Sequence, residues 1–333
     1  MSQPKEKLIS IVVPVLNEEE NIEPFYSTVK EELIRLGKDC DYEFIFTDNR
    51  STDSTFDRLQ ELARRDERVK IARFSRNFGY QKSIFTGYCL ASGDCAIEMD
   101  VDLQDPPELL PQFIAKWQEG YEVVYGIRNT RKESWLINQI RKIFYKFINL
   151  LSDDDLPLNA GDFRLVDRKV LNQLLTLHDA TPYLRGTIAS MGFNQIGIPY
   201  SRNKRVRGYG KFNFRNLVSL AIDGILNHSI MPLRLATLTG LIIVAGLILY
   251  IASLFVLTAL FHFEWPRGFA TISILILISI SLNAFFLGII GEYLGRIFRQ
   301  LKGRPLATID RTVNLDSNTL NQIEAASRPS ISK

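Results

Sequence analysis

Short runs of apolar, often β-branched residues alternate along the chain with longer amphipathic segments. The apolar runs cover residues 8–15, 42–47, 69–74 and 96–99. Runs of this length without polar alternation are typical of buried parallel strands. The segments between them are typical of helices and extend to about 36, from 55 to 65, and to about 91. The repeated strand, loop and helix order predicts an α/β domain with a doubly wound, mostly parallel sheet.

Each of these four strands is followed by a polar loop. The loops cover residues 14–18, 48–51, 76–80 and 100–105. Ligands of doubly wound sheets bind outside the carboxyl ends of the strands, so we expect the four loops to border one crevice. Neither a G-x-G-x-x-G motif nor a Walker loop occurs, which argues against a dinucleotide dehydrogenase or a P-loop enzyme.

The loop after the fourth strand carries two carboxylates, Asp100 and Asp102. They are two residues apart, so an extended backbone points both side chains in the same direction. At a separation of roughly 4 Å they repel by about 4 kcal/mol at an effective dielectric of ~20, which favours a divalent cation between them or a proton on one. Mg2+ or Mn2+ suits such oxygen ligands, and Gln104 can add a neutral oxygen. The alternative is a solvated acidic turn before a helix that begins near Pro107.

Residues 232–295 are nearly free of charge, unlike the first 230. Two apolar stretches, about 233–260 and 269–292, each exceed the roughly 20 residues needed to span a bilayer. Their short connector predicts a transmembrane hairpin over residues 231–295. Basic residues flank both ends of it, so the positive-inside rule predicts cytoplasmic termini. The tail, 296–333, is predicted to be basic at first and then disordered.

The first 230 residues are predicted to form a cytoplasmic domain with two amphipathic juxtamembrane helices, about 135–151 and 212–230. In the first helix, apolar residues share one face and basic residues, including Arg141, mostly the other. This pattern suits an anionic membrane surface, with an ordinary core-packing helix as the alternative.

The composition argues against several other classes of protein. A net charge of +3 over 333 residues is too small to argue for nucleic acid binding. Three scattered cysteines without a Cys-x-x-Cys motif argue against a zinc site or a disulfide framework, and the polar N-terminus is no signal peptide.

The basic residues are nevertheless clustered. A further strand, 123–128, ends in Arg128, and together with Arg141 and the segment 202–211 it supplies cations for a lipid phosphate. Attraction to anionic headgroups is the alternative role of the last segment. A metal pair beside a basic, membrane-associated region suggests a water-soluble, phosphate-bearing donor that meets a lipid-borne acceptor.

Seven short motifs occur between residues 8 and 305. They are PVLNE at 14–18, DNRSTD at 48–53, SRNFG at 75–79, DVDLQDPP at 100–107, GIR at 126–128, DFRL at 162–165 and RVRGYGK at 205–211. In that order they resemble family 2 glycosyltransferases, and more narrowly the polyprenyl-phosphate glycosyltransferases related to dolichol-phosphate mannose synthase. GEYLGR at 291–296, with KGRP at 302–305, resembles the end of the bacterial two-helix branch.

The resemblance implies a GT-A, Rossmann-like fold and inverting transfer of a sugar from a nucleotide sugar to a polyprenyl phosphate. The residues that would hold Mg2+ or Mn2+ on the donor diphosphate are Asp100, Asp102 and Gln104. Those that would line the nucleotide-sugar pocket are Pro14, Leu16, Glu18, Asp48 and Asp100. Those that fall where the family binds acceptor and donor phosphates are Arg128, Arg141, Arg205 and Lys211. The catalytic residues would be Asp102, Asp162 and Arg128.

Asp162 matches a family position discussed as a general base. A phosphate monoester has its second pKa near ~6, so the nucleophile is already largely anionic at neutral pH and needs no strong base. We therefore expect Asp162 to orient the acceptor or its cations, with a structural carboxylate that caps Arg164 as the alternative.

The chain departs from the family pattern at two positions. The family usually has two paired acids in the second loop, and this chain has Asp48 and Asn49 there. Which residues contact the nucleotide base therefore stays open. Gly210 replaces a common serine, which leaves one acceptor contact open.

The expected donor is UDP-glucose, because the two-helix branch often uses it, and the expected acceptor is undecaprenyl phosphate. GDP-mannose, UDP-linked amino sugars and a modified arabinose stay open as donor sugars. The predicted setting is the inner membrane, in the synthesis of a cell envelope glycan, and a homo-oligomer also stays open.

The sequence is less consistent with two rival functions. A processive polysaccharide synthase would carry more membrane helices and a Gln-x-x-Arg-Trp motif, and neither occurs here. A non-catalytic membrane module that only binds a nucleotide is disfavoured by the intact acids Asp100 and Asp102.

Overall fold

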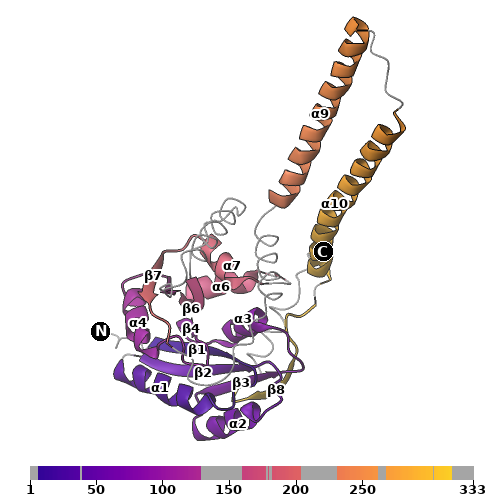
Figure 1. Ribbon diagram of the computed structural model, residues 1–333. Coiled ribbons are helices and arrows are strands. Elements are labelled where there is room, and N and C mark those ends of the chain that lie inside the picture. Colours follow the sequence, from indigo (N-terminus) through magenta and orange to yellow (C-terminus); the bar gives the residue numbers. More distant parts are fainter. Residues whose placement is uncertain are drawn as a thin grey trace, which may run out of the picture.

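The computed structural model describes residues 7–37, 40–128, 160–177, 179, 182–203, 231–261, 268–302 and 304–316. Figure 1 shows an α/β domain built on a twisted sheet, from which two long helices extend. The predicted amphipathic helices, 135–151 and 212–230, lie outside the described residues, and so do Arg141, Arg205 and Lys211.

The sheet has eight strands in the order β7-β5-β6-β4-β1-β2-β3-β8. The strands are β1 (Lys7–Val15), β2 (Cys40–Asp48), β3 (Val69–Phe74), β4 (Cys95–Glu98), β5 (Val123–Arg128), β6 (Ala160–Asp167), β7 (Gln195–Tyr200) and β8 (Ile309–Val313). The central strands β4, β1, β2 and β3 are parallel, whereas β6 runs antiparallel to both β4 and β5. The predicted Rossmann-like α/β domain is therefore confirmed, with a mixed sheet.

Helices cover both faces of this sheet (Figure 1). One face carries α1 (Ile22–Arg35), α2 (Thr55–Arg65) and α4 (Leu110–Gln118), and the other carries α3 (Tyr80–Leu90), α6 (Arg168–Thr176) and α7 (Leu184–Ser190). Successive residues of β1 point to opposite faces, so Ile11 packs in the first layer and Val12 in the second, and both are fully buried. This two-sided burial explains why the parallel strands are continuous apolar runs.

Helix α3 lies close against β1, because the residue that crosses the strand is a glycine. A Cβ at Gly87 would collide with the side chain of Val12. At the other end of α3, Ser83 donates a hydrogen bond of 2.9 Å to Thr47 Oγ1 in β2. The first residue of α3, Tyr80, is thereby held at the carboxyl ends of the parallel strands.

The two long helices are α9 (Met231–Phe261) and α10 (Phe269–Leu301). They contact one another, for instance where Gly240 lies beside Phe286. Within the described residues, Ile278–Leu301 is long and apolar enough to cross a membrane, and α9 holds a shorter apolar segment, Leu238–Tyr250. The structure thus supports one span of the predicted hairpin by length and composition.

The C-terminal segment differs from the predicted tail, 296–333, which was expected to be basic at first and disordered after Ile309. Helix α10 continues to Leu301, and β8 then pairs antiparallel with β3 at the edge of the sheet. Ile309 and Val313 pack against the two core layers, while Asp310 and Arg311 are exposed. Five residues of mixed charge carried too weak a local pattern to predict a strand that is stabilised by a distant partner.

Candidate active site

A cavity of about 290 Å³ lies at the carboxyl ends of β1, β2 and β4. It is lined by Pro14, Val15, Leu16, Glu18, Asn49, Asn77, Gly79, Tyr80, Asp100, Val101 and Asp102. All four loops that follow the parallel strands contribute, as expected from the topology of the sheet. Of the residues predicted for the nucleotide-sugar pocket, Pro14, Leu16, Glu18 and Asp100 line this cavity.

Asp48, the fifth residue predicted for that pocket, lies beneath the cavity. Its side chain is fully buried, its Oδ1 accepts the Ser51 N–H at 2.9 Å, and its Oδ2 lies 3.4 Å from Arg73 Nε. The carboxylate therefore shapes the loop after β2 from below and is not part of the cavity lining.

The neighbouring Asn49 joins the second loop to the third. Its Oδ1 accepts the Phe78 N–H at 3.1 Å, and its Nδ2 donates to the Gly79 carbonyl at 3.3 Å. The contact uses one donor and one acceptor of the same amide, which a carboxylate cannot supply. This pair of hydrogen bonds accounts for an asparagine where the family usually has an acid.

Asp100 and Asp102 both face the cavity, but they are held differently. Asp102 Oδ1 accepts the backbone N–H of Gln104 at 3.1 Å. Asp100 Oδ1 accepts a hydrogen bond of 2.7 Å from the Tyr80 hydroxyl, and its Oδ2 lies 3.4 Å from Arg202 Nη2. Burial, followed by the nearby Asp105 carboxylate, raises the pKa of Asp100 to about 6.

Glu98 lies behind Asp100 and is 1% exposed. Burial, followed by the charge of Asp100, raises the pKa of Glu98 well above its ordinary value. This concentration of carboxylates is an environment that favours a bound cation.

Asp100 and Asp102 suit a hard divalent ion only if further oxygen atoms, from a bound phosphate or from water, complete the coordination of the ion. Within the described part of the chain, no group of three or more His, Cys, Asp or Glu side chains is arranged to hold a metal ion. Asp100 and Asp102 supply hard oxygen donors at the cavity, to which phosphate oxygens can be added. Gln104 does not line the cavity, and its backbone N–H and carbonyl bond to Asp102 and Asn203.

A further acid, Asp105, is neutralised by two arginines from other parts of the chain. It is fully buried, with Arg128 Nη2 at 3.4 Å from Oδ2 and Arg202 Nε at 3.2 Å from Oδ1. Tyr200, the last residue of β7, donates its hydroxyl to Asp105 and accepts from Arg128 Nε at 3.2 Å. Burial lowers the pKa of Arg128, but the charge of Asp105 outweighs it and raises that pKa above its ordinary value.

Asp162 lies in β6 and is 9% exposed. Arg185 Nε from α7 lies 3.2 Å from its Oδ1, and Gln81 Nε2 from α3 donates to the same oxygen at 3.3 Å. Arg164 instead donates to the Gly161 carbonyl at 2.9 Å. The structure therefore pairs Asp162 with Arg185, which favours the orienting role over the alternative in which Asp162 caps Arg164.

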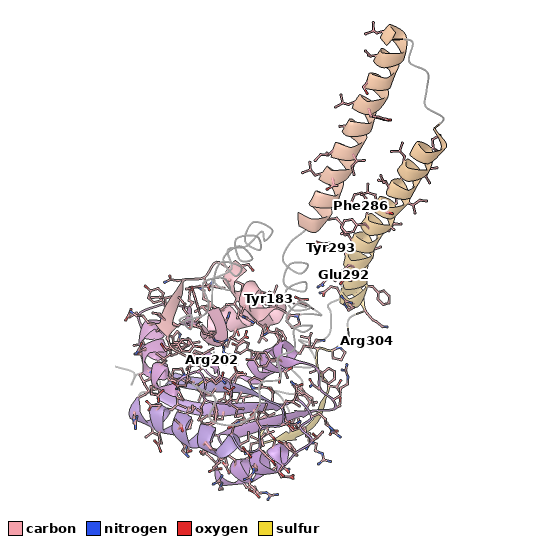
Figure 2. The ribbon with its side chains drawn as sticks, viewed as in Figure 1. Tyr183, Arg202, Phe286, Glu292, Tyr293 and Arg304 are labelled. Carbon is pink, nitrogen blue, oxygen red and sulfur yellow. The ribbon has the colours of Figure 1, made fainter. Side chains whose placement is uncertain are left out.

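Sequence patterns missed Tyr80, Arg185, Tyr200 and Arg202 as individual site residues. Tyr80 ends the loop 76–80, which was expected to border the crevice, and Arg202 begins the basic segment 202–211. Arg185 and Tyr200 carry no local signal. Figure 2 shows Tyr183 and Arg202 on the side of the α/β domain from which α9 and α10 extend. Glu292 and Tyr293 lie near the end of α10 closest to this domain. Arg304 lies between that end of α10 and the domain.

Comparison with known proteins shows which family this chain resembles. The model of the family described as "Glycosyl transferase family 2" matches residues 10–175. The uncharacterized glycosyltransferase YkcC of Bacillus subtilis is 38% identical over 312 residues, which cover 93% of this chain and 96% of that protein. The bactoprenol glucosyl transferase of Shigella phage SfV is 38% identical over 298 residues, covering 89% and 96%.

A solved mannosyltransferase, PcManGT from Pyrobaculum calidifontis in complex with GDP-Man and Mn2+, is also similar. It is 16% identical, with a TM-score of 0.48, and the match covers 89% of this chain and 86% of that one.

Proposed function

The chain belongs to glycosyl transferase family 2, as its motifs predicted, and we propose that it transfers glucose from UDP-glucose to a membrane polyprenyl phosphate such as undecaprenyl phosphate. Relatives named bactoprenol glucosyl transferase match it over nearly their whole length. The structural observation that carries the proposal is the pair Asp100 and Asp102, which face one cavity at the carboxyl ends of the parallel strands.

The donor half of the reaction belongs to this cavity. Asp100 and Asp102 would hold Mg2+ or Mn2+ against the diphosphate, with Gln104 as a third, more distant candidate. A divalent ion bound there offsets the charge that develops on the leaving diphosphate. Pro14, Leu16 and Glu18 would contact the nucleotide, and the buried Asp48 would support them from below.

The acceptor half belongs to the arginines beside the acids. Arg128 is the candidate within the described residues, and Arg141, Arg205 and Lys211 remain proposals from their motifs. The acceptor phosphate would attack the anomeric carbon from the side opposite the diphosphate, which inverts its configuration. Because that phosphate is already an anion, Asp162 need not remove a proton. The contact of Asp162 with Arg185 supports a role for Asp162 in orienting the basic side chains around the acceptor.

The return of the chain to the sheet supports the proposed membrane topology. Strand β8 comes after both long helices and pairs with β3, so residues 309–313 lie on the same side of the membrane as the α/β domain. The segment between them must then cross the membrane an even number of times. With one span in α10, α9 would supply the other, and both termini would be cytoplasmic, as the basic flanks predict.

The deciding experiment is transfer of label from radiolabelled nucleotide sugars to a short-chain polyprenyl phosphate, with Mn2+ or with EDTA. We expect a metal-dependent glycolipid from UDP-glucose with the intact protein and at least a 100-fold loss in Asp102→Ala, in line with the loss of transition-state charge stabilisation. Asp57→Ala, which removes an exposed acid on α2, is the matched control.

The other outcomes assign other functions. Product from GDP-mannose, a UDP-linked amino sugar or an arabinose donor alone would move the proposal to that sugar. Metal-dependent nucleotide binding without product from any donor would favour the non-catalytic module instead.

A further inference from the structure

Tyr80, the first residue of α3, contacts both the cavity and the acids behind it. The residue lines the cavity and is 40% exposed. Its hydroxyl, in contrast, lies among the acids, 2.7 Å from Asp100 Oδ1, to which it donates, and 3.1 Å from Glu98 Oε1. The side chain therefore reaches across the cavity wall to the carboxylates that end β4.

Asp100 depends for its orientation on side chains from other parts of the chain. Asp102 is held within its own loop by the Gln104 N–H. Asp100 is held by side chains from elsewhere, with Tyr80 on Oδ1 and Arg202 facing Oδ2. Rotation of the Asp100 carboxylate is thus restricted by an element 20 residues away in the sequence.

The backbone beside Tyr80 is itself fixed. Gly79, which precedes it, has a φ of 98°, a conformation that favours glycine. Asn49 holds the Phe78 N–H and the Gly79 carbonyl, and the Asn77 side chain accepts the Gly79 N–H at 2.8 Å. A side chain that starts from such a restrained turn can orient its partner within a narrow range.

We propose that Tyr80 is a positioning residue, whose hydroxyl holds Asp100 in the orientation that presents a carboxylate oxygen to the divalent ion on the donor diphosphate. The inference rests on the proposed function of the cavity. The hydrogen bond occupies Oδ1 and leaves Oδ2 for a ligand. Binding of the ion would then displace only the longer contact with Arg202, while the contact with Tyr80 persists.

The test measures binding of Mn2+ in the presence of UDP by electron paramagnetic resonance, on the full-length protein in detergent. Tyr80→Phe removes the hydroxyl and keeps the ring. We expect it to weaken Mn2+ binding about tenfold and to raise KM for the nucleotide sugar by a similar factor, as one charge-assisted hydrogen bond is lost. KM for the polyprenyl phosphate and the melting temperature should stay within error.

Two further variants make the result specific. Tyr42→Phe removes a hydroxyl near the amino end of β2, whereas the cavity lies at the carboxyl ends of the parallel strands. The Tyr42 ring packs against Arg68, and this variant should bind Mn2+ like the wild type. Tyr80→Leu removes ring and hydroxyl together, and its loss of Mn2+ affinity should match that of Tyr80→Phe.

Three results would overturn the inference. If Tyr80→Phe binds Mn2+ as tightly as Tyr42→Phe, the hydroxyl does not position Asp100. If only Tyr80→Leu loses affinity, the ring matters and the hydroxyl does not. If the wild type binds no Mn2+ with UDP, the proposed function fails as well, which distinguishes that failure from the first two.

Discussion

Single side chains at and near the cavity hold together segments that are far apart in the sequence. Asn49 connects the loop after β2 to the loop before α3, and Gln81 connects α3 to α7, because its Oε1 accepts the Leu184 N–H at 3.1 Å. These contacts use specific donors and acceptors, so close chemical analogues are expected to differ in effect.

The first prediction at this scale concerns the amide of Asn49. Asn49→Asp removes the donor to the Gly79 carbonyl and buries a charge against it, so we expect the domain to lose about 1–3 kcal/mol of unfolding free energy. The control is Asn77→Asp, which keeps the oxygen that accepts the Gly79 N–H. Denaturant unfolding measures both, and equal stability of the two variants would contradict the prediction.

The second prediction concerns pH. Burial alone would raise the pKa of Asp66, but hydrogen bonds from Arg68, Tyr26 and Lys30 outweigh it and hold that pKa well below its usual range. A carboxylate with a depressed pKa stabilises the fold above its unfolded pKa of about 3.9, and this stabilisation is lost as the pH falls further.

Asp66→Asn should therefore be less stable than the wild type at pH 7, and the difference should shrink between pH 5 and pH 3. Melting temperatures across this range test the trend. A difference that stays constant with pH would show that the charge of Asp66 does not contribute.

At the scale of elements, β8 connects the long helix α10 to the loops around the cavity. The Ser75 N–H donates to the Thr308 carbonyl at 2.9 Å, and Arg50 Nη1 lies 2.6 Å from Asp310 Oδ2. Asn314 Nδ2 donates to the carbonyls of Ala63 and Val69 at 2.9 and 3.0 Å. The end of α10 is thus tied to the domain only a few residues after the helix.

A third prediction tests this connection. Val313 packs against the core layer that also holds α1 and α2. Val313→Asp should release β8, lower stability by about 1–3 kcal/mol and speed amide exchange in β3, because apolar burial and edge pairing are lost. Asp310→Asn, which affects only an exposed ion pair, should cost less than about 1 kcal/mol. Unchanged exchange in the Val313 variant would show that β8 is not required at that edge.

At the scale of the whole molecule, the pairing of β8 with β3 constrains topology. We predict that a cysteine at His262, between α9 and α10, is labelled by a membrane-impermeant maleimide on intact spheroplasts. A cysteine at Asp316 should be labelled only after permeabilisation, because it follows β8. Labelling of both positions from the same side would rule out a hairpin with two spans.

The sequence by itself determined the features that depend on neighbouring residues. Apolar runs predicted the parallel strands β1 to β4, and the spacing of Asp100 and Asp102 predicted that both carboxylates face one cavity. The ordered motifs predicted the family. The strands follow from local periodicity and the family from the order of the motifs, both of which the chain carries without reference to distant residues. The expected extended backbone is wrong for the two acids, because β4 ends at Glu98 and Asp102 lies in the turn after it, so strand alternation is not the reason that both carboxylates face the cavity.

Only the tertiary structure decided which distant groups meet. Tyr80 reaches Asp100, Arg202 lies against Asp105, and Arg185 pairs with Asp162, because strands distant in sequence end at one edge of the sheet. The same is true of β8, which pairs with a strand more than 230 residues earlier. No local pattern encodes these contacts, since their energy comes from burial and partners that exist only once the sheet has formed.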